Sequence, residues 1–370
     1  MNYLLSIVVP TKDRYYYLKN LIELILSFNS DEIELVIQDN TLDNSEILDY
    51  LGGISCAHIV YNHQKEQIPI SDNATNAILN SSGEYVCFIG DDDGVTNGII
   101  DQVKEMKKNG YDAMLTRNTI YNWPDYKDDS IFHLSGVMTL SKSVKNHVID
   151  SKRELKKACD NGFLNLGCLP RVYQGVVKRS VLDELYKRCG SFFPGPSPDM
   201  ANAVALTYFV DKVWYSDCPT IITGQCKSVG GGERLLDKLV SLTDVSHLPK
   251  DILSYWDNNL PTLWCTDTIW PGSAYVAANR VGIELDTNYN RIYGHFVFNH
   301  PSYKETISQF KRNCLLVEYY KYRLFFHKLL TWFLNRVTYY LSSKKKIQSQ
   351  MVFRNLSTIK EANNILSKML

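Results

Sequence analysis

Residues 83–95 read GEYVCFIGDDDGV, and this stretch decides the fold. The apolar run 85–89 has the composition of a buried strand, and it ends in Gly90 followed by Asp91, Asp92 and Asp93. Adjacent carboxylates repel one another, so at a strand end they need either full solvation or a cation. Mg²⁺ or Mn²⁺ suits such a place, because these ions bind through one or two carboxylates plus substrate phosphates. On the motif alone, a solvated acidic turn remains the alternative.

The sequence around this stretch alternates between strand and helix patterns. Short apolar runs separated by amphipathic helices predict a parallel sheet buried on both faces. Ligands bind beyond the carboxyl ends of strands in such sheets, so the loops after Val9, Ile37 and Ile89 are expected to share one crevice. The predicted strands are 4–9, 33–37, 58–61 and 84–89, and the predicted helices are 17–28, 45–51, 72–79 and 99–108.

In the middle of the chain the pattern changes to shorter strands, and a domain boundary is expected after them. Shorter strands are expected at 111–116 and 131–138, a charged helix at 144–159, a strand and helix at 172–177 and 181–188, and a helix at 200–209. Three consecutive glycines, Gly230, Gly231 and Gly232, predict a loop that ends the first domain near residue 235. We therefore expect an α/β catalytic domain at 1–235 and a mainly helical region at 236–370.

Residues 4–235 resemble family 2 glycosyltransferases with the GT-A fold, a Rossmann-like mixed sheet flanked by helices. The opening SIVVPTKDR (6–14) resembles the family's first strand, and the resemblance places Pro10 and Thr11 in the nucleotide pocket. The segment LVIQDNTLD (35–43) is similar to its second-strand signature, which implies that Asp39 accepts a hydrogen bond from uracil. The implied donor is a UDP-sugar.

The most specific part of the resemblance is NATNAILNSSGEYVCFIGDDD (73–93). It implies a ribose and metal role for Asp91, the principal metal ligand at Asp92 and a supporting metal role for Asp93, with Mn²⁺ or Mg²⁺ as the cofactor. Many members read Asp-x-Asp-Asp here, whereas this chain has Gly90 in place of the first aspartate. Asn73 is implied in donor binding, but the arginine that often stands next to it in the family is missing, so another cation or the metal alone must serve the diphosphate.

A second chemical feature is PSPDMANAVAL (196–206), which places Asp199 at a helix start behind two prolines. Propensity alone predicts a helix cap. The resemblance implies instead that Asp199 is the general base. Inverting sugar transfer needs one base for the acceptor hydroxyl and one metal for the leaving diphosphate.

Composition sets the remaining limits. The formal net charge of zero argues against a nucleic-acid partner, although residues 1–100 hold 15 acidic and 4 basic side chains while residues 301–350 hold 10 basic and 2 acidic. The nine cysteines show no metal-ligand spacing and are expected to be reduced. The first residues do not resemble a secretion signal, and no apolar run is long enough to span a bilayer, so we expect a cytoplasmic protein, with peripheral contact at the inner face of the plasma membrane as a further hypothesis.

Weaker candidates lie outside these motifs. Trp264, Trp270 and Tyr275 either stack on acceptor sugars or belong to the core, and His295 and His300 are interpreted as structural. Residues 228–232 are either a lid over the donor or a plain surface loop. For residues 311–346, two interpretations stay open: a helical tail that packs its aromatics on the catalytic domain, or an anchor on an anionic membrane surface.

The sequence therefore predicts a metal-dependent, inverting glycosyltransferase of O-antigen, capsule or other surface polysaccharide synthesis. Its acceptor would be a glycan or a lipid-linked oligosaccharide. Two rivals remain: a catalytically silent GT-A-like scaffold, which Gly90 suggests, and another nucleotide-dependent transferase. Against the second rival, the chain contains neither a GxxxxGK[ST] loop nor a GxGxxG turn.

Overall fold

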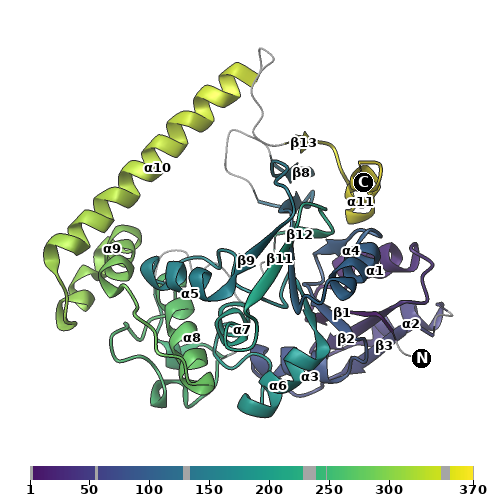
Figure 1. The fold of residues 1–370 in the computed structure, drawn as a ribbon, viewed down its shortest axis with the longest axis horizontal. Helices are drawn as coiled ribbons and strands as arrows, with labels where there is room; N and C mark the ends of the chain where they lie inside the picture. Colours follow the sequence, from purple (N-terminus) through teal and green to yellow (C-terminus); the bar gives the residue numbers. More distant parts are fainter. Residues whose placement is uncertain are drawn as a thin grey trace.

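The computed structural model describes residues 3–54, 57–127, 134–227, 239–246, 248–342 and 351–369. Two sheets with their flanking helices form an α/β body, and a helical region extends from one side of it (Figure 1). The strands are β1 (Leu5–Thr11), β2 (Ile33–Asp39), β3 (Ile59–His63), β4 (Tyr85–Phe88), β5 (Gly94–Val95), β6 (Ala113–Thr116), β7 (Thr119–Asn122), β8 (Val137–Leu140), β9 (His147–Asp150), β10 (Val176–Lys178), β11 (Lys212–Ser216), β12 (Ile221–Gln225) and β13 (Met351–Phe353).

Most helices flank the sheets, and those within residues 266–342 form the lateral region (Figure 1). They are α1 (Tyr15–Leu26), α2 (Ser45–Gly52), α3 (Ile70–Leu79), α4 (Ile99–Lys108), α5 (Ser151–Asp160), α6 (Arg179–Cys189), α7 (Pro198–Leu206), α8 (Thr266–Val281), α9 (Tyr289–Asn299), α10 (Cys314–Ser342) and α11 (Ile359–Ser367). Three 3-10 helices join them: η1 (Leu242–Asp244), η2 (Ile252–Ser254) and η3 (Pro301–Gln309).

The large sheet confirms the predicted α/β fold and its mixed character. Its strand order is β3-β2-β1-β4-β10-β6-β11-β9. The first four strands of the chain are parallel, as predicted, because a helix connects each to the next. Strand β10 runs antiparallel between β4 and β6, so the sheet is mixed beyond its first half.

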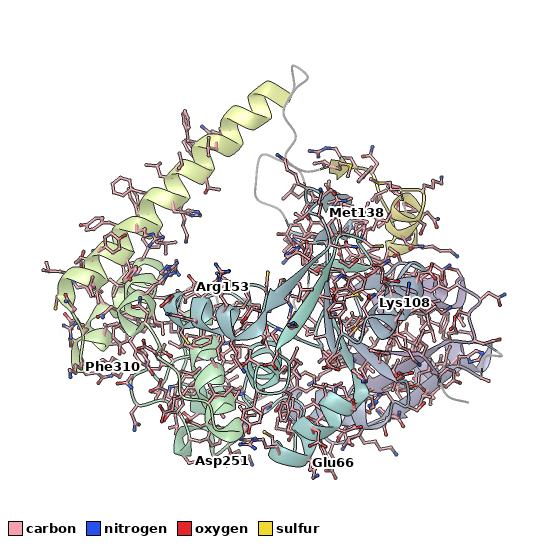
Figure 2. The ribbon with its side chains drawn as sticks, in the orientation of Figure 1. Glu66, Lys108, Met138, Arg153, Asp251 and Phe310 are labelled. Carbon is pink, nitrogen blue, oxygen red and sulfur yellow. The ribbon has the colours of Figure 1, made fainter. Side chains whose placement is uncertain are left out.

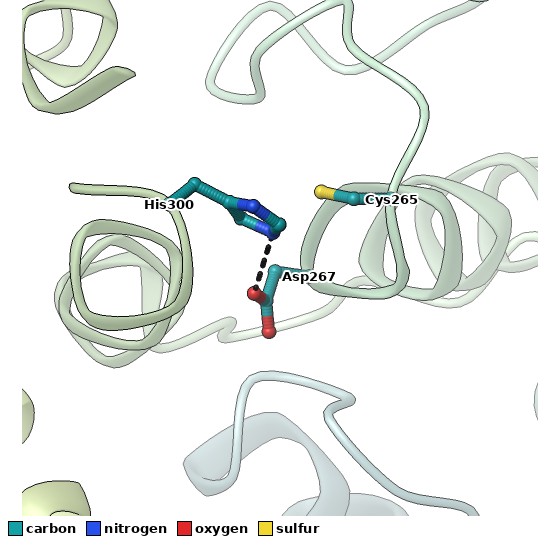
Figure 3. Close-up of side chains that lie close together, drawn as sticks. All are labelled: Cys265, Asp267 and His300. Atoms are coloured by element: carbon teal, nitrogen blue, oxygen red, sulfur yellow. Dashed lines mark ion pairs between the residues drawn. The ribbon is translucent and has the colours of Figure 1, made fainter. Parts of the chain in front are cut away.

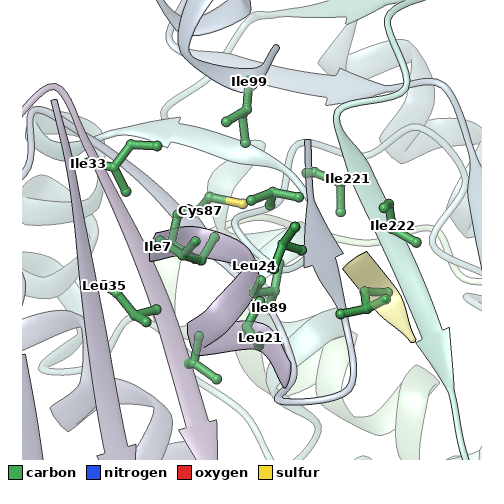
Figure 4. Close-up of a cluster of buried hydrophobic side chains, with 14 of the residues drawn as sticks. Ile7, Leu21, Leu24, Ile33, Leu35, Cys87, Ile89, Ile99, Ile221 and Ile222 are labelled. Atoms are coloured by element: carbon green, nitrogen blue, oxygen red, sulfur yellow. The ribbon is translucent and has the colours of Figure 1, made fainter. Parts of the chain in front are cut away.

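The main hydrophobic core lies between the sheet and α1 with its neighbours (Figure 4). Ile7 of β1 and Cys87 of β4 are fully buried there, together with Leu21 and Leu24 of α1. These helix residues recur at the spacing of one helix face, which is the pattern that predicted the helix. Burial on both faces explains why β1, β2 and β4 are continuous apolar runs.

Two sequence predictions need correction. The charged segment 144–159 is not one helix, because His147–Asp150 forms the edge strand β9, which pairs with β11. The Asp150 side chain then accepts a hydrogen bond from Arg153 N at 2.7 Å and caps α5. The strand expected at 131–138 is also misplaced, because residues 135–136 form a turn and β8 begins at Val137. Strands β5, β7, β11, β12 and β13 were not predicted.

The end of the chain returns to its beginning. Strand β13 pairs with β8 in the small sheet, and α11 packs against α1 and β5. A Cβ on Gly94 would lie 2.6 Å from Ile359 Cγ1, which shows how closely α11 approaches β5. The predicted boundary at residue 235 lies outside the described residues. The segment 351–369 belongs in space with the N-terminal half.

Helix α10 extends away from the body with little of its surface covered (Figure 1). Figure 2 shows the described side chains of α10 projecting from both sides of the helix. Leu315 is 83% exposed and Phe326 61% exposed. The hypothesis that this segment packs its aromatics on the catalytic domain is therefore wrong for most of the helix. None of the described helices is long and apolar enough to cross a membrane.

Candidate active site

Three strand ends meet at one edge of the large sheet. Thr11 at the end of β1 lies opposite Asp39 at the end of β2, and Asn40 N donates to Thr11 O at 3.0 Å. The Thr11 hydroxyl donates to Asp91 Oδ2 at 2.7 Å, just beyond the end of β4. The loops after β1, β2 and β4 thus come together as the parallel topology predicted.

Arg14 lies between the first two aspartates. Its Nη2 is 2.7 Å from Asp92 Oδ2, and its Nε is 3.0 Å from Asp91 Oδ1 without the alignment of a hydrogen bond. Burial raises the pKa of Asp91, and the Arg14 charge opposes that rise. Burial alone would lower the pKa of Arg14, but the two carboxylates raise it overall. A protein cation therefore already balances part of the acidic cluster.

Asp92 is the carboxylate that stays open to solvent. Its side chain is 14% exposed, against 3% for that of Asp91. Oδ2 pairs with Arg14, while Oδ1 receives no hydrogen bond from the described part of the chain. Among the three aspartates, Asp92 has the geometry that best suits binding of an added cation.

Asp93 faces the protein. Its carboxylate accepts from Gly90 N at 2.8 Å, from Gly224 N at 2.7 Å and from Gln174 Nε2 at 3.1 Å. Burial raises its pKa, the Asp92 charge adds to the rise, and the three donors oppose it. With both oxygens occupied, Asp93 shapes the turn, and the expected metal role has no free oxygen to support it in this geometry.

Neighbouring strands hold the backbone of the turn in place. Trp123 Nε1 donates to Asp92 O at 2.9 Å. Strand β12 passes so close that a Cβ on Gly224 would lie 1.7 Å from the same carbonyl oxygen. Only glycine fits at that position without a shift of the backbone.

The expected nucleotide residues surround this turn. Asp39 is fully buried, and its carboxylate accepts from Tyr15 at 2.7 Å, Tyr61 at 2.8 Å and Thr41 N at 2.9 Å. A base bound at Asp39 would have to share these acceptor sites. Asn73 on α3 is buried, and its Oδ1 has no hydrogen-bond partner among the described residues, which leaves an acceptor for a ligand.

Pro10 is half-buried at the end of β1, beside Thr11. It continues the strand, in register with Gln38 of β2. Its ring therefore lies at the edge that carries the strand-end loops.

Asp199 lies at the first turn of α7, behind Pro198. Ser197 Oγ and Met200 N both donate to its Oδ1, the latter at 2.8 Å. Burial raises the pKa of Asp199. The interpretation of Asp199 as the helix cap is wrong, because Ser197 occupies the N-cap position and Asp199 is the second residue of the helix, where its charge faces the positive end of the helix dipole. The base interpretation stays a prediction.

Tyr173 connects Asp199 with the acidic turn. Burial raises its pKa, and three carboxylates in its surroundings, those of Asp93, Asp92 and Asp199, raise it further. Gln174 Nε2 contacts the Tyr173 hydroxyl at 3.5 Å as well as Asp93. Asp199 and the aspartates after β4 thus share one electrostatic neighbourhood.

Sequence reasoning missed Arg14, Gln174 and Gly224. Arg14 stands in the quoted segment 6–14, directly after the first strand, and its charge beside a predicted strand end was the available signal. Gln174 and Gly224 carry no comparable signal, because their contacts depend on strands that join the turn from far along the chain.

Outside this region, a Cys, Asp and His group could hold a metal ion. Ligand atoms of Cys265, Asp267 and His300 lie within 4.8 Å of one another, and Figure 3 shows the ion pair that joins His300 to Asp267. Trp264 and His295 lie nearby, at a cavity of the helical region, while Trp270 packs against two core clusters. The proposed lid at 228–232 lies outside the described residues.

Comparison with known proteins agrees with the sequence resemblance. Residues 6–163 match the family model of glycosyl transferase family 2. No curated protein matches the chain.

Solved structures of S. aureus TarS are similar at low identity. TarS 1–349 in complex with UDP-GlcNAc is 14% identical with a TM-score of 0.46, and the match covers 83% of this chain and 74% of that one. The same TarS fragment in complex with UDP is 13% identical with a TM-score of 0.41, covering 83% of both chains. For longer S. aureus TarS the identity is 14%, the TM-score is 0.44, and the match covers 83% of this chain but only 44% of that chain.

Proposed function

We propose that the protein transfers a sugar from a UDP-sugar to a glycan acceptor with inversion, because residues 6–163 match the family model of glycosyl transferase family 2. The observation that carries this proposal is the meeting of Thr11, Asp91 and Asp92 at the carboxyl edge of the sheet. Such an edge is where α/β proteins bind nucleotides.

We assign the donor to the crevice between the loops after β1, β2 and β4. Thr11 and Asp39 lie on neighbouring strand ends, and Asn73 offers an unpartnered buried oxygen. Arg14 provides a cationic guanidinium at the place where a diphosphate would lie beside Asp92. It is the candidate for the cation that the sequence lacks near Asn73, because guanidinium groups bind phosphate with two donors.

The residues fit a divalent cation held mainly through Asp92. Its Oδ1 receives no hydrogen bond from the described residues, and Asp91 lies next to it with a charge that burial makes costly. Mg²⁺ and Mn²⁺ accept one or two carboxylates and take further ligands from substrate phosphates and water. When bound, such an ion neutralises charge on the leaving diphosphate. Asp92 and Asp91 would hold it, while Asp93 keeps the turn in shape.

We propose Asp199 as the general base. Inversion requires one carboxylate that accepts the acceptor hydroxyl proton as the oxygen attacks the anomeric carbon. The pKa of Asp199 is raised by burial, which makes the carboxylate a stronger base than an exposed aspartate. Its link to the acidic turn through Tyr173 supports a place near the donor sugar.

We further propose that α10 lies on an anionic membrane surface, which suits synthesis of an O-antigen, a capsule or another surface polysaccharide on a lipid-linked acceptor. The helix exposes aromatic and leucine side chains along its length. Its charged residues are Glu318, Lys321, Arg323, Lys328 and Arg336, so positive charge prevails. Basic residues interleaved with exposed aromatics are typical of interfacial helices.

The experiment that tests the transferase proposal is hydrolysis of UDP-sugars with Mn²⁺, followed through release of free UDP. Asp92→Ala should lower the rate by about 100-fold or more, because metal-assisted charge stabilisation contributes several kcal/mol. Asp49→Ala, an exposed acidic residue on α2, is the matched control and should keep the wild-type rate. Thermal-shift measurements across UDP, GDP, CMP and dTDP sugars would identify the donor base.

A catalytically silent scaffold is the rival, and one observation favours it: Arg14 already pairs with Asp92 and Asp91. A scaffold of this kind would bind UDP with equal affinity in the presence and absence of Mn²⁺ and would release no UDP from any sugar nucleotide. Turnover that depends on both Mn²⁺ and Asp92 excludes it. Release of pyrophosphate in place of UDP would indicate a nucleotidyltransferase.

A further inference from the structure

A cavity lies in the helical region, apart from the donor site proposed at the strand ends. Its volume is about 870 Å³, it is open to solvent on one side, and it is lined by the segment 161–165 after α5, the start of α8, and helices α9 and α10. This volume is in the range of ligand sites in proteins. Nothing in the proposed donor site uses it.

Positive charge dominates the walls of this cavity. Arg291 of α9 and the α10 residues Arg323 and Lys328 line it, together with three histidines. Asp267 is the one carboxylate among the lining residues. Asn299 Nδ2 donates to Asp267 at 2.8 Å and His300 Nε2 lies 3.6 Å from it, so this carboxylate is already engaged.

The three cations are poorly balanced by acidic groups: Asp160 acts on Arg291 and Lys328 acts on Asp267, but only from beyond ion-pair distance. Within the described segments, no ion pair joins Arg291, Arg323 or Lys328 to a carboxylate that could neutralise it. Lys328 Nζ donates to Asn299 Oδ1 at 3.1 Å, and the buried Nε of Arg291 has no hydrogen-bond partner there. Groups of like charge around one cavity are costly unless an anion compensates them.

The positive charge of these cations affects the pKa of His295, which also lines the cavity. Burial, followed by the charges of Arg291, Lys328 and Arg323, lowers the pKa of His295 to about 4. Arg291 responds in the same way, since burial lowers its pKa and Arg323 adds to the fall. The cavity therefore disfavours further positive charge.

This field also decides against a metal ion at Cys265, Asp267 and His300 (Figure 3). The Cys265 thiol is kept protonated because burial raises its pKa, and Asp267 already has two partners. A divalent cation would add charge where cations already gather. An anion would relieve the repulsion.

We propose that this cavity is a phosphate subsite, which binds a phosphate or diphosphate group carried by the glycan acceptor, an assignment that rests on the proposed sugar transfer. Two arginines and one lysine line the cavity, and these are the residue types that bind phosphate oxygens in proteins. The segment 161–171 connects the cavity with the base: Asn161 and Asn165 line the cavity, and the Arg171 guanidinium donates to Gly167 O and lies in the electrostatic neighbourhood of Asp199. The acceptor would reach from the subsite toward Asp199.

The test is calorimetric titration of the full chain with inorganic pyrophosphate in EDTA, which removes divalent metal from the strand-end crevice. Wild type should bind, and Arg323→Ala/Lys328→Ala should weaken binding by about tenfold or more, since charge-assisted hydrogen bonds are lost. Both residues are exposed on α10, so the variant should fold. Lys304→Ala/Lys311→Ala removes the same charge from exposed positions outside the cavity and should bind as wild type does.

Equal pyrophosphate affinity in wild type and the Arg323→Ala/Lys328→Ala variant would overturn the subsite, as would absence of binding to wild type. Binding of Zn²⁺ that is lost in Cys265→Ser, without any binding of pyrophosphate, would assign the cavity to a cation instead. UDP binding with Mn²⁺ is measured on the same proteins and should not change in the α10 variant. A failure of UDP binding in wild type therefore counts against the transferase proposal, while pyrophosphate reports on the cavity alone.

The source of the phosphate is distinguished by competition. Vesicles of phosphatidylcholine with phosphatidic acid present a lipid phosphomonoester, and vesicles of phosphatidylcholine alone do not. If only the first vesicles displace pyrophosphate, the subsite takes a lipid-borne phosphate. If neither displaces it while glucose 1-phosphate does, the subsite takes a soluble phosphorylated glycan.

Discussion

The Arg14 guanidinium is the cationic partner of Asp91 and Asp92 in the acidic turn. Asp91 and Asp92 lie along one edge of it, Asp91 near Nε and Asp92 near Nη2. Breaking a buried pair by removing one partner leaves an uncompensated charge, whereas removing both partners does not. Arg14 is therefore expected to stabilise the fold as well as the donor.

Arg14→Ala should lower the free energy of unfolding by about 3 kcal/mol, because Asp91 would remain buried without its counter-charge. Urea denaturation measures the loss. The double variant Arg14→Ala/Asp92→Ala should recover part of it, since one of the stranded carboxylates is gone. Strictly additive losses in the two single variants would show that Arg14 and Asp92 are not coupled. UDP affinity should fall with Arg14→Ala alone if the guanidinium also contacts the diphosphate.

Asp199→Asn should lower the transfer rate by about 10² to 10⁴-fold, the usual contribution of a general base, while UDP affinity stays near that of wild type. Steady-state rates and calorimetry with UDP measure the two effects. Asp211→Asn, an exposed aspartate just before β11, is the control. A variant with full turnover would remove the assignment and leave Asp199 as a structural residue of the first turn of α7.

The pH dependence follows from the same side chain. Catalysis needs the carboxylate, and burial raises the pKa of Asp199, so the rate should rise with pH through a midpoint above the ordinary aspartate range. A raised pKa in the folded state favours the protonated form, so its contribution to stability is present at low pH and lost as pH rises through that pKa. Asp199→Asn should therefore be more stable than wild type at alkaline pH. The measurements are kcat/KM and thermal unfolding between pH 4 and 9, as an approximate working range.

At the level of elements, periodicity predicted the first four strands and their helices because each signal lies within its own segment. Leu18, Leu21 and Ile22 repeat on one face of α1 and are all buried. Strand β9 was missed because its residues alternate poorly and are mostly exposed at a sheet edge. Strand β12 was missed because partners from distant parts of the chain define it. The same limit applies to Gly224 in the site.

The close approach of β12 to the acidic turn gives a prediction at this scale. Gly224→Ala would place a Cβ 1.7 Å from Asp92 O, so the turn or the strand must move. We expect a loss of about 1–3 kcal/mol in unfolding free energy, as for other overpacked sites, together with weaker Mn²⁺-dependent UDP binding.

Gly52→Ala is the matched control, because nothing lies within 4 Å of a Cβ at that helix position. Its unfolding free energy should stay the same or rise by up to about 1 kcal/mol, since alanine is the better helix former. Urea midpoints for both variants decide the matter. Similar stability in the two variants would contradict the close approach.

At the scale of the whole molecule, the acidic and basic parts of the chain have different proposed roles. The acidic N-terminal half carries the proposed donor site at the strand ends. The basic C-terminal region carries α10 and the cavity that α10 lines together with α9 and the start of α8. Strand β13 and helix α11 then return to the first half and pack against β8 and α1. This return fixes the chain on both sides of α10, which was not predictable from composition. The chain is therefore attached to the body both before and after α10, through α9 and through β13 with α11.

Exposed aromatics on α10 should bind anionic vesicles. The triple variant Phe326→Ala/Trp332→Ala/Phe333→Ala removes three side chains that are each more than half exposed, so its fold should be kept. We expect its affinity for vesicles with phosphatidylserine to fall by about tenfold or more, since each buried ring contributes on the order of 1–2 kcal/mol. Wild-type binding should also weaken in high salt, because basic residues near the surface add about 1 kcal/mol each. Sedimentation of protein with vesicles measures both.

The control is Leu48→Ala/Leu79→Ala/Leu253→Ala, which removes exposed apolar side chains from other surfaces and should bind vesicles as wild type does.

The competing occupant of the exposed α10 face is a second copy of the chain. Leu315, Tyr319, Tyr322, Phe326, Leu329 and Phe333 follow one another at alternating intervals of four and three residues and are all exposed. Such spacing also suits a helix pair. Four basic residues against one acidic residue on α10 would repel a second copy, which favours the membrane. If the aromatic variant converts a dimer to a monomer in analytical ultracentrifugation and leaves vesicle binding unchanged, the face is an interface between copies.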